Sequence, residues 1–446
     1  MRKFLNQIDY PILIAVIALL AFGFIMIASI GVNKSIDLSV KSYYSATTEY
    51  AKNENGDILF DESGKAIVVK EGEWIEYPNC SDERIDCYRL AKSHFFKMLF
   101  ALVVFIVVLK INYQWWRKFA LPLFVIVFFM LASIAFFGTA YGTIAKNWII
   151  IPGLGSIQPS EFAKLALIFY FAIWMERRPQ DISTFHGGFL PFCIIASILI
   201  LPIMIQPDLG STMVLAVIAV AMYFAAGASF RHLFLGALIV ILFSVIAISQ
   251  VDYIGGRFKS YLNPTEENCR PDPALGEKQK DYCWQSEQAN IAVGSGGIFG
   301  LGLAQGIQKN EYLPQASDDF IFAASAEELG FVRIFLVVFA YFFIAYRGIR
   351  IAKYAPDRFG QLLALGITVY VCFQAFVNIG VNISLLPVTG ITLPFISFGG
   401  SSLLSSLIAV GVLLNISKHT TAYAYSSNWR GDSRSYPSAR RHYRRG

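Results

Sequence analysis

The chain has 446 residues, of which 55% are hydrophobic and only 15% are charged. Soluble globular domains carry about 25% charged residues, so this composition excludes an ordinary soluble enzyme and predicts a protein that crosses a membrane several times. The formal net charge of +6 is spread over the segments between apolar runs. It therefore indicates membrane topology and contact with anionic lipids, and it does not require a nucleic-acid partner.

Ten apolar runs of spanning length follow one another along the chain, and each predicts a membrane helix. They lie at residues 11–31, 95–110, 119–139, 160–175, 189–205, 211–228, 232–249, 329–346, 361–382 and 402–416. The first run lacks a cleavage site and is too long for a signal peptide, so we expect it to remain as the first span. The sequence thus predicts an all-α polytopic membrane protein. Its parts are a short N-terminal segment (1–10), a ten-helix domain (11–416) and a disordered basic tail (417–446).

Lysine and arginine concentrate in alternate loops between the runs, and such loops are expected to be cytoplasmic. Arg2 and Lys3 precede the first run, Arg177 and Arg178 follow the fourth, and the tail is rich in arginine. Both termini are therefore expected in the cytoplasm, with residues 32–94 and 250–328 outside. Residues 32–94 are acidic, with turn signals and short alternating pieces, which predicts a small folded insert or hairpin.

Four of the six cysteines lie in the two outer segments: Cys80, Cys87, Cys269 and Cys283. Four cysteines allow three pairings, and the sequence alone does not choose among them. The short separations make Cys80 with Cys87 and Cys269 with Cys283 the simplest pairing, and disulfides persist in an oxidising compartment. A zinc site is the alternative, which the lack of a nearby histidine disfavours.

Polar residues gather at the outer ends of the predicted spans. Glu161 and Lys164 in "QPSEFAKLAL" are three residues apart and share one helical face. They predict either a salt bridge that locks helices together or part of a site for an anion and a hydroxyl group. Lys146 and Trp148 have a similar double interpretation, as interfacial anchors or as sugar and phosphate contacts.

The next polar groups follow the fifth and seventh predicted spans. Gln206 and Asp208 occur in "QPDLGSTM", where Asp208 is suited to cap the next helix, to line a pocket, or both. The long outer segment contains Arg257 and a glycine-rich stretch that ends near Lys309. Glycine-rich backbone can offer N–H groups to phosphate, although it equally serves close packing. No Walker lysine-serine signature follows, which disfavours nucleotide hydrolysis.

The stretch "EYLPQASDDFIFAASAEELG" places four carboxylates around an apolar run: Asp318, Asp319, Glu327 and Glu328. Charge beside lipid is costly, so it tends to persist where it has a function. The segment "LLPVTGITLPFISFGGSSLL", which contains Ser401, predicts irregular backbone that lines a cavity. The outer surface thus combines carboxylates, cations and flexible backbone, a combination suited to a lipid-linked anion.

Six ordered strings give the chain a family resemblance from about 95 to 416: "QPSEFAKLAL", "QPDLGSTMV", "RFKSYLNP", "AVGSGGIFGLGL", "EYLPQASDDFIFAASAEELGF" and "LLPVTGITLPFISFGGSSLL". Together they resemble the SEDS family of cell-wall proteins, the FtsW and RodA group. The resemblance implies the ten-helix SEDS fold in a bacterial inner membrane. It also implies peptidoglycan glycosyltransferase activity on lipid II, with a class B penicillin-binding protein and other divisome or elongasome proteins as partners. "GITLPFISFGGSS" favours the FtsW wording, while septal, elongation and sporulation roles stay open.

The resemblance also assigns roles to single residues. The family's essential aspartate lies in a pattern like "HTDFIF", which reads "SDDFIF" here, so Asp319 takes the aspartate position while Ser317 and Asp318 depart from the pattern. The insert at 32–94 is longer than the family leads us to expect. Substrate-binding positions carried over by the motifs or by the outer polar segments are Lys146, Trp148, Gln158, Glu161, Lys164, Gln206, Asp208, Arg257, Lys309, Glu327, Glu328 and Ser401.

The mechanism that this assignment implies uses Asp319 as a general base for a sugar 4-hydroxyl, although a helix cap is the competing role. Lys164, Arg257 and Lys309 would stabilise the departing pyrophosphate. The sequence requires no cofactor, and Mg²⁺ or Mn²⁺ is compatible with the site without being demanded by it. Two other functions remain as alternatives: a flippase or transporter for a lipid-linked precursor, and a structural recruiter of division partners.

Overall fold

The protein is described by a computed structural model over residues 8–50, 68–71, 75, 78–138, 147–151, 155–250, 252–265, 269, 283–310 and 312–420. The longer helices are α2 (Tyr10–Ile30), α4 (Arg89–Lys110), α5 (Trp116–Phe137), α6 (Pro159–Arg177), α7 (Leu190–Ile205), α8 (Leu209–Ala225), α9 (Phe230–Gln250), α13 (Ile321–Lys353), α14 (Arg358–Asn382) and α15 (Gly400–Ser417). The remaining elements are α3 (Val32–Thr47), α10 (Asp252–Leu262), α12 (Trp284–Gly296), the short turns η1 (Tyr113–Trp115) and η2 (Phe185–Phe189), and the strands β1 (Glu49–Tyr50), β2 (Val68–Lys70), β3 (Ile149–Ile151) and β4 (Gly155–Ile157).

Each of the ten predicted spans coincides with a helix, and the polytopic helical fold is confirmed. In the described part of the chain, seven helices are long and apolar enough to cross a membrane: α2, α4, α5 with η1, α7 with η2, α13, α14 and α15. Three helices lie outside that group. α6 carries Glu161, Lys164, Glu176 and Arg177, and α8 has 17 residues. The side chains of α9 are described over only part of the helix. The count of ten spans stays a prediction.

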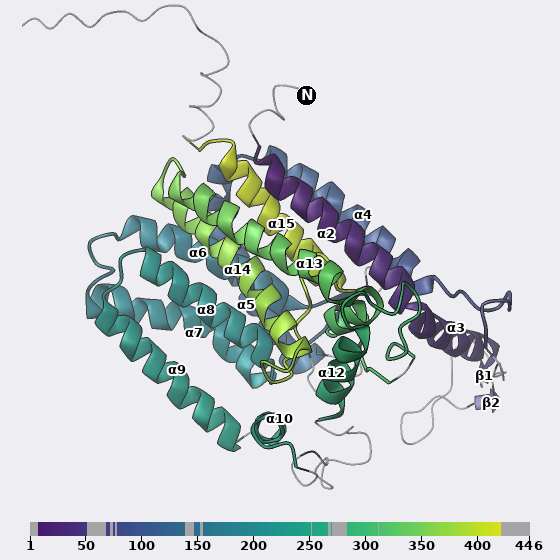
Figure 1. The fold of residues 1–446 in the computed structure, drawn as a ribbon. Helices are drawn as coiled ribbons and strands as arrows, with labels where there is room; N and C mark the ends of the chain where they lie inside the picture. The colour runs from purple at the N-terminus through teal and green to yellow at the C-terminus, as the bar shows by residue number, and fades with distance from the viewer. Residues whose placement is uncertain are drawn as a thin grey trace, which may run out of the picture.

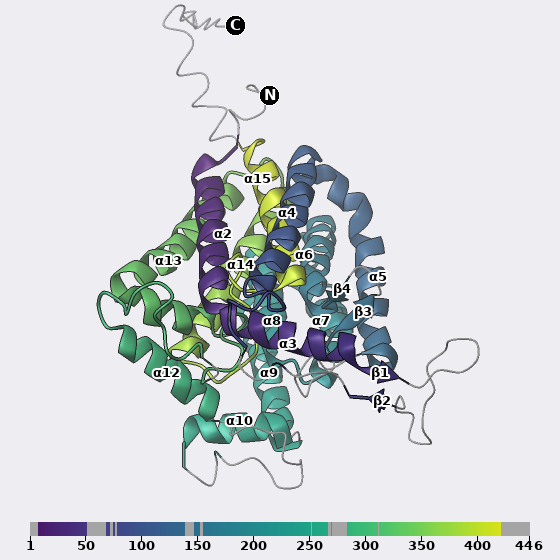
Figure 2. The same ribbon diagram turned by 90° about the vertical axis from the view of Figure 1, so that its right-hand side faces the viewer.

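The helices form a bundle with α14 and α15 at its centre (Figure 1). α15 packs against α4, α14 and α6, and α14 also packs against α13 and α8. The start of α2 and the end of α15 lie at one end of the bundle, whereas α3, α10, α12 and the β1–β2 pair lie at the other (Figure 2). The described elements of residues 32–94 and 250–328 are therefore gathered at a single end.

α13 is interrupted near its start by Gly330, whose φ of 77° lies in the left-handed region. A Cβ on Gly330 would lie only 2.2 Å from the backbone nitrogen of Gly300. This close approach lets the two segments pair: the N–H of Leu301 donates to the carbonyl of Glu327 at 3.0 Å. Irregular backbone inside the bundle is thus hydrogen-bonded to its own chain, as membrane depth requires.

The insert after α2 begins with a helix that the sequence pattern did not predict. α3 is polar along most of its length, but Val40 on its buried side packs with Ile75, Ile85 and Cys87 in a small separate core. The expected hairpin character is present in part, since β1 and β2 pair antiparallel with Glu49 opposite Lys70. The described part of the insert therefore contains a helix and a short β pair.

Two disulfides close small loops in the outer segments. Cys80 is bonded to Cys87 with Cα atoms 5.7 Å apart, and Cys269 is bonded to Cys283 with Cα atoms 5.2 Å apart. These are the pairings that the sequence separations favour. The two remaining cysteines, Cys193 and Cys372, are free thiols within α7 and α14.

Candidate active site around Asp319

Asp319 lies in the turn that precedes α13, and the backbone there is fixed by α14. The carbonyl oxygen of Asp319 accepts hydrogen bonds from the side-chain amides of Asn378 at 2.7 Å and Asn382 at 2.9 Å. Two asparagines four residues apart lie on one face of a helix, so α14 holds this single carbonyl with two donors. The turn that carries Asp319 is therefore anchored to two buried side chains of α14.

The Asp319 carboxylate itself is available to accept a hydrogen bond or a proton from a ligand. Within the described residues no hydrogen bond to its oxygens is present, and the side chain is only partly exposed. A Cβ on Gly390, whose φ is 74°, would lie 3.6 Å from Oδ2 of Asp319. Because Gly390 adopts a conformation that favours glycine, this side of the carboxylate stays open. The group can accept a proton from a ligand without first breaking an internal bond.

The surroundings hold the pKa of Asp319 far above its ordinary value. Burial is the largest cause and the neighbouring Asp318 carboxylate adds to it, while Arg257 and Lys34 act in the opposite direction, so that the pKa is raised to about 7. A carboxyl with a pKa near the working pH is suited to general base catalysis, since it is ionised in part yet basic enough to take a proton.

Two charged groups predicted from the sequence face Asp319 from other elements. Arg257 of α10 donates from Nη1 to the carbonyl of Val388 at 2.9 Å and lowers the pKa of Asp319 by its charge. Asp208 acts in the opposite direction by raising it. These interactions place α8, α10 and the turn before α13 around one site.

Asp208 has the capping role that the sequence predicts. Its carboxylate caps α8 by accepting from the N–H of Ser211 at 2.9 Å, and the hydroxyl of Ser160 donates to it at 3.4 Å. Burial raises the pKa of Asp208, although the Ser211 bonds oppose that shift. The helix cap is thus confirmed, and the role of Asp208 in lining a pocket stays a prediction.

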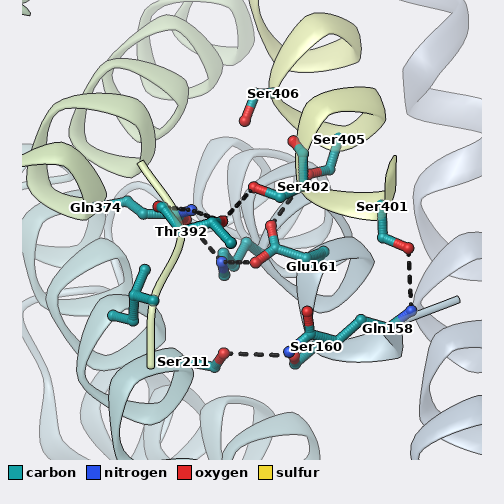
Figure 3. A network of polar contacts seen from close by, with 12 residues as sticks. Gln158, Ser160, Glu161, Ser211, Gln374, Thr392, Ser401, Ser402, Ser405 and Ser406 are labelled. Atoms are coloured by element: carbon teal, nitrogen blue, oxygen red, sulfur yellow. Dashed lines mark hydrogen bonds and ion pairs between the residues drawn. The ribbon is translucent and has the colours of Figure 1, made fainter. Parts of the chain in front are cut away.

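Behind this site lies a fully buried polar network that joins α6, α14 and α15 (Figure 3). Lys164 binds Glu161 at 2.7 Å and the side-chain oxygen of Gln374 at 2.7 Å. The other carboxylate oxygen of Glu161 accepts from Tyr370 at 3.3 Å and Ser405 at 3.2 Å. Every charge in the network has a partner, which is the condition under which a buried ion pair is tolerated.

Glu327, Glu328 and Lys309 form a second polar cluster, which fixes the glycine-rich loop to α13. Glu327 accepts from the backbone N–H of Ile307 at 2.9 Å. Glu328 accepts from Ser29 at 2.7 Å and from Lys309 at 2.7 Å. Both carboxylates are buried, so the described contacts of this cluster serve to hold the loop.

The other predicted positions belong to the network of Figure 3, make separate contacts or lie outside the described residues. Ser401 accepts from the backbone N–H of Gln158 at 3.1 Å and so joins α15 to the start of α6. Gln206 donates to the carbonyl of Leu131 at 3.2 Å. Trp148 is half-buried directly before β3. Lys146 lies outside the described residues.

Among the described residues, no group of three His, Cys, Asp or Glu is placed to hold a metal ion, and a role for Mg²⁺ or Mn²⁺ stays a prediction.

Sequence reasoning missed Asn378, Asn382 and Lys34. A signal existed for the asparagines, because "FVNIGVN" places two amides on one face of an otherwise apolar helix. No local signal pointed to Lys34, whose partners are more than 280 residues away in the chain: its separation from Asp318 is 284.

The fold and the site together define a polytopic helical membrane protein with a half-buried acid before α13. The sequence profile of the family described as "Cell cycle protein", the FtsW, RodA and SpoVE family, matches residues 80–422. The chain belongs to this family and is a multi-pass protein of the bacterial inner membrane.

Several curated relatives are similar over most of their length. A probable peptidoglycan glycosyltransferase FtsW of Trichlorobacter lovleyi is 39% identical over 72% of this chain and 82% of its own. Stage V sporulation protein E of Bacillus subtilis is 41% identical over 75% of this chain and 90% of its own. The FtsW protein of Bacillus subtilis is 32% identical over 94% of this chain and 92% of its own.

Solved structures share the fold at lower sequence identity. A chain from a peptidoglycan synthase complex superposes with a TM-score of 0.65 at 21% identity, covering 92% of this chain and 97% of its own. The rod shape determining protein RodA of Thermus thermophilus superposes with a TM-score of 0.58 at 20% identity, covering 93% and 98%. The SEDS fold expected from the sequence is thereby confirmed.

Proposed function

We propose that the protein is a peptidoglycan glycosyltransferase that polymerises lipid II into glycan strands. The observation that carries this proposal is the Asp319 carboxylate, which combines a pKa of about 7 with an open side and a backbone fixed by two asparagines. The relatives named as peptidoglycan glycosyltransferases support the same activity.

In the proposed reaction Asp319 accepts the proton of a sugar 4-hydroxyl. The hydroxyl oxygen forms a bond to the anomeric carbon of a second lipid-linked sugar, and the bond from that carbon to the phosphate oxygen breaks. Polyprenyl pyrophosphate leaves with the bonding electrons. General base catalysis of this kind contributes roughly 10²- to 10⁴-fold to the rate.

Arg257 is the strongest candidate to stabilise the charge of the leaving pyrophosphate. Among the described arginines, it is the one whose charge acts on Asp319. Lys164 and Lys309 instead bind the carboxylates of Glu161 and Glu328. We therefore assign Lys164 and Lys309 to holding the site in shape and Arg257 to the substrate. A cation that meets developing negative charge in a poorly solvated site is a large contribution to catalysis.

The topology and the partner belong to the same proposal. Basic residues in alternate loops favour a cytoplasmic location for both termini, which places Asp319 at the outer face of the membrane. The similarity to a chain of a peptidoglycan synthase complex supports a class B penicillin-binding protein as the partner that crosslinks the product. The FtsW-like motifs favour a division role.

The test uses the purified full-length chain in detergent with labelled lipid II and a candidate class B partner. We expect long glycan chains from the wild type and none from Asp319→Asn, with both proteins folded. A matched control is Asp37→Asn, which removes an exposed carboxylate on α3 that pairs with Lys41, and which should leave chain formation unchanged.

The same preparations distinguish the transporter alternative. The buried charges of Glu161 and Lys164 are the feature that favours it, since transporters place such groups inside the bundle. If no partner supports chain formation while wild-type protein in vesicles moves labelled lipid II between leaflets, the glycosyltransferase proposal fails and transport replaces it.

A further inference from the structure

Lys34 connects the insert to the turn that carries Asp319. It lies in the first turn of α3, and its Nζ is 2.7 Å from Oδ2 of Asp318. The same nitrogen lies within 3.5 Å of the side-chain oxygens of Gln315 and Ser317. The other carboxylate oxygen of Asp318 accepts from the hydroxyl of Ser317 at 2.9 Å. One side chain of α3 thus contacts three of the five residues that lead up to Asp319.

The two features that depart from the family pattern are therefore in direct contact. Asp318 stands where the resembling family has an uncharged residue, and the long insert supplies the lysine that binds it. A second contact lies beside it, where Asn33 donates to Asn310 at 2.6 Å. The start of α3 consequently lies along residues 310–318.

α3 is itself held in place from its other side. The N–H of Leu90 donates to the hydroxyl of Ser35 at 3.0 Å, and Ser39 exchanges hydrogen bonds with the backbone of Asp86 at 3.3 Å. Val40 packs in the small core that contains the disulfide-bonded Cys87. Because α3 is fixed against the start of α4, Lys34 is presented to Asp318 by a supported helix.

The Lys34–Asp318 pair contributes little to stability. The side chains of Lys34 and Asp318 retain 38% and 21% of their exposure, and exposed ion pairs contribute little because solvent screens them and their side chains lose entropy. The main effect of the Lys34–Asp318 ion pair is therefore on the electrostatic field at the Asp319 carboxylate. An unpaired carboxylate at the adjacent residue would oppose ionisation of the base, whereas a paired one opposes it less.

We propose that Lys34 is a positioning residue of the transferase site, which binds Asp318 and thereby screens Asp319 from this neighbouring carboxylate. This inference rests on the proposed function of Asp319 as the base. Lys34 itself touches no reacting atom in this assignment. It makes the insert an integral support of the site.

Among the described residues, few charged groups face Asp319. Asp318 belongs to its own turn, Lys34 comes from α3, Arg257 from α10, and Asp208 from the start of α8. Lys97 of α4 lies near Asp318 and Lys34, over the ring of Phe398. Arg257 is assigned to binding the substrate. Removing Lys34 therefore changes the electrostatic field at Asp319 with less direct effect on substrate binding than removing Arg257.

The test compares the pH dependence of glycan formation in four full-length proteins: wild type, Lys34→Ala, Asp318→Asn and the double variant. Removing Lys34 leaves Asp318 unpaired, so the acidic limb of the kcat profile should move to higher pH by roughly half to one unit. At pH 7 kcat should fall about two- to fivefold with KM little changed, and it should recover near pH 8.5. The double variant should return the limb close to its wild-type position.

A matched control is Lys41→Ala, which removes a lysine from the same helix that pairs with Asp37 away from the site. Its pH profile should equal that of the wild type. An acidic limb that does not move in Lys34→Ala, or a loss of rate that neither high pH nor Asp318→Asn restores, would overturn the role of Lys34. If the wild type forms no glycan with any partner, the proposed function fails and this inference fails with it.

Discussion

Replacing Asp319 with asparagine should stabilise the protein as well as remove its activity. The ordinary pKa of an aspartate carboxyl is 3.8, and the site raises it to about 7, chiefly by burial. Between these two values the folded protein retains a proton that the unfolded chain releases, so stability falls as the pH rises from about 4 to about 7. An asparagine has the same shape and does not titrate, so the variant should lack this fall.

The size of the effect follows from the shift. About three pKa units at about 1.4 kcal/mol each correspond to roughly 4 kcal/mol of unfolding free energy at pH 8. Asp319 is partly exposed, and water at its edge reduces the penalty, so we expect a gain of about 1 to 2 kcal/mol. For a chain of 446 residues this gives a rise in apparent Tm of about 1 to 2 °C in thermal unfolding.

The pH dependence of the difference is the decisive measurement. Thermal unfolding of both proteins in detergent should show the gain at pH 8 and almost none at pH 4, where both side chains are neutral. Asp37→Asn, at an exposed site on α3, should show no such pattern. Equal Tm values at pH 8, or a gain of the same size at pH 4, would refute the description of Asp319 as a buried base.

Two further predictions concern the interior. Lys164→Met leaves the Glu161 carboxylate buried without its cation, which should lower the unfolding free energy by about 3 to 5 kcal/mol, measured by thermal unfolding. The double variant Lys164→Met, Glu161→Gln should recover part of that loss. A Lys164→Met variant as stable as the wild type would contradict the buried pairing. Gly330→Ala should lower stability by at least about 2 kcal/mol because it combines a left-handed φ with a steric overlap. Gly294→Ala, where a Cβ meets nothing within 4 Å, should be neutral, and equal unfolding temperatures for the two glycine variants would show that the close approach at Gly330 is not rigid.

The sequence predicted features that depend on local spacing. Apolar length placed the helices, and a three-residue spacing placed Glu161 and Lys164 on one face, where they bind each other at 2.7 Å. The capping role of Asp208 followed from its position before a helix. In each case the partners lie within one or two turns of each other, so the sequence contains the whole pattern.

Features that depend on distant partners could not be predicted in the same way. Asn378 is 59 residues from the carbonyl that it binds, and Lys34 is 284 residues from Asp318. α3 lacks a long apolar stripe because only a few of its side chains face the insert core. Its helix is supported by contacts with α4, and such contacts override local preference.

The contact between Gly300 and Gly330 also has an evolutionary consequence. At each position a Cβ would overlap the backbone of the other segment. Because both residues are already glycine, a larger residue at one position cannot be accommodated by a smaller residue at the other. Neither position can therefore drift by a compensating exchange. Evolution can alter the contact between Gly300 and Gly330 only by changing the backbone of both segments. We therefore expect both glycines to be retained while the neighbouring loop is free to diversify.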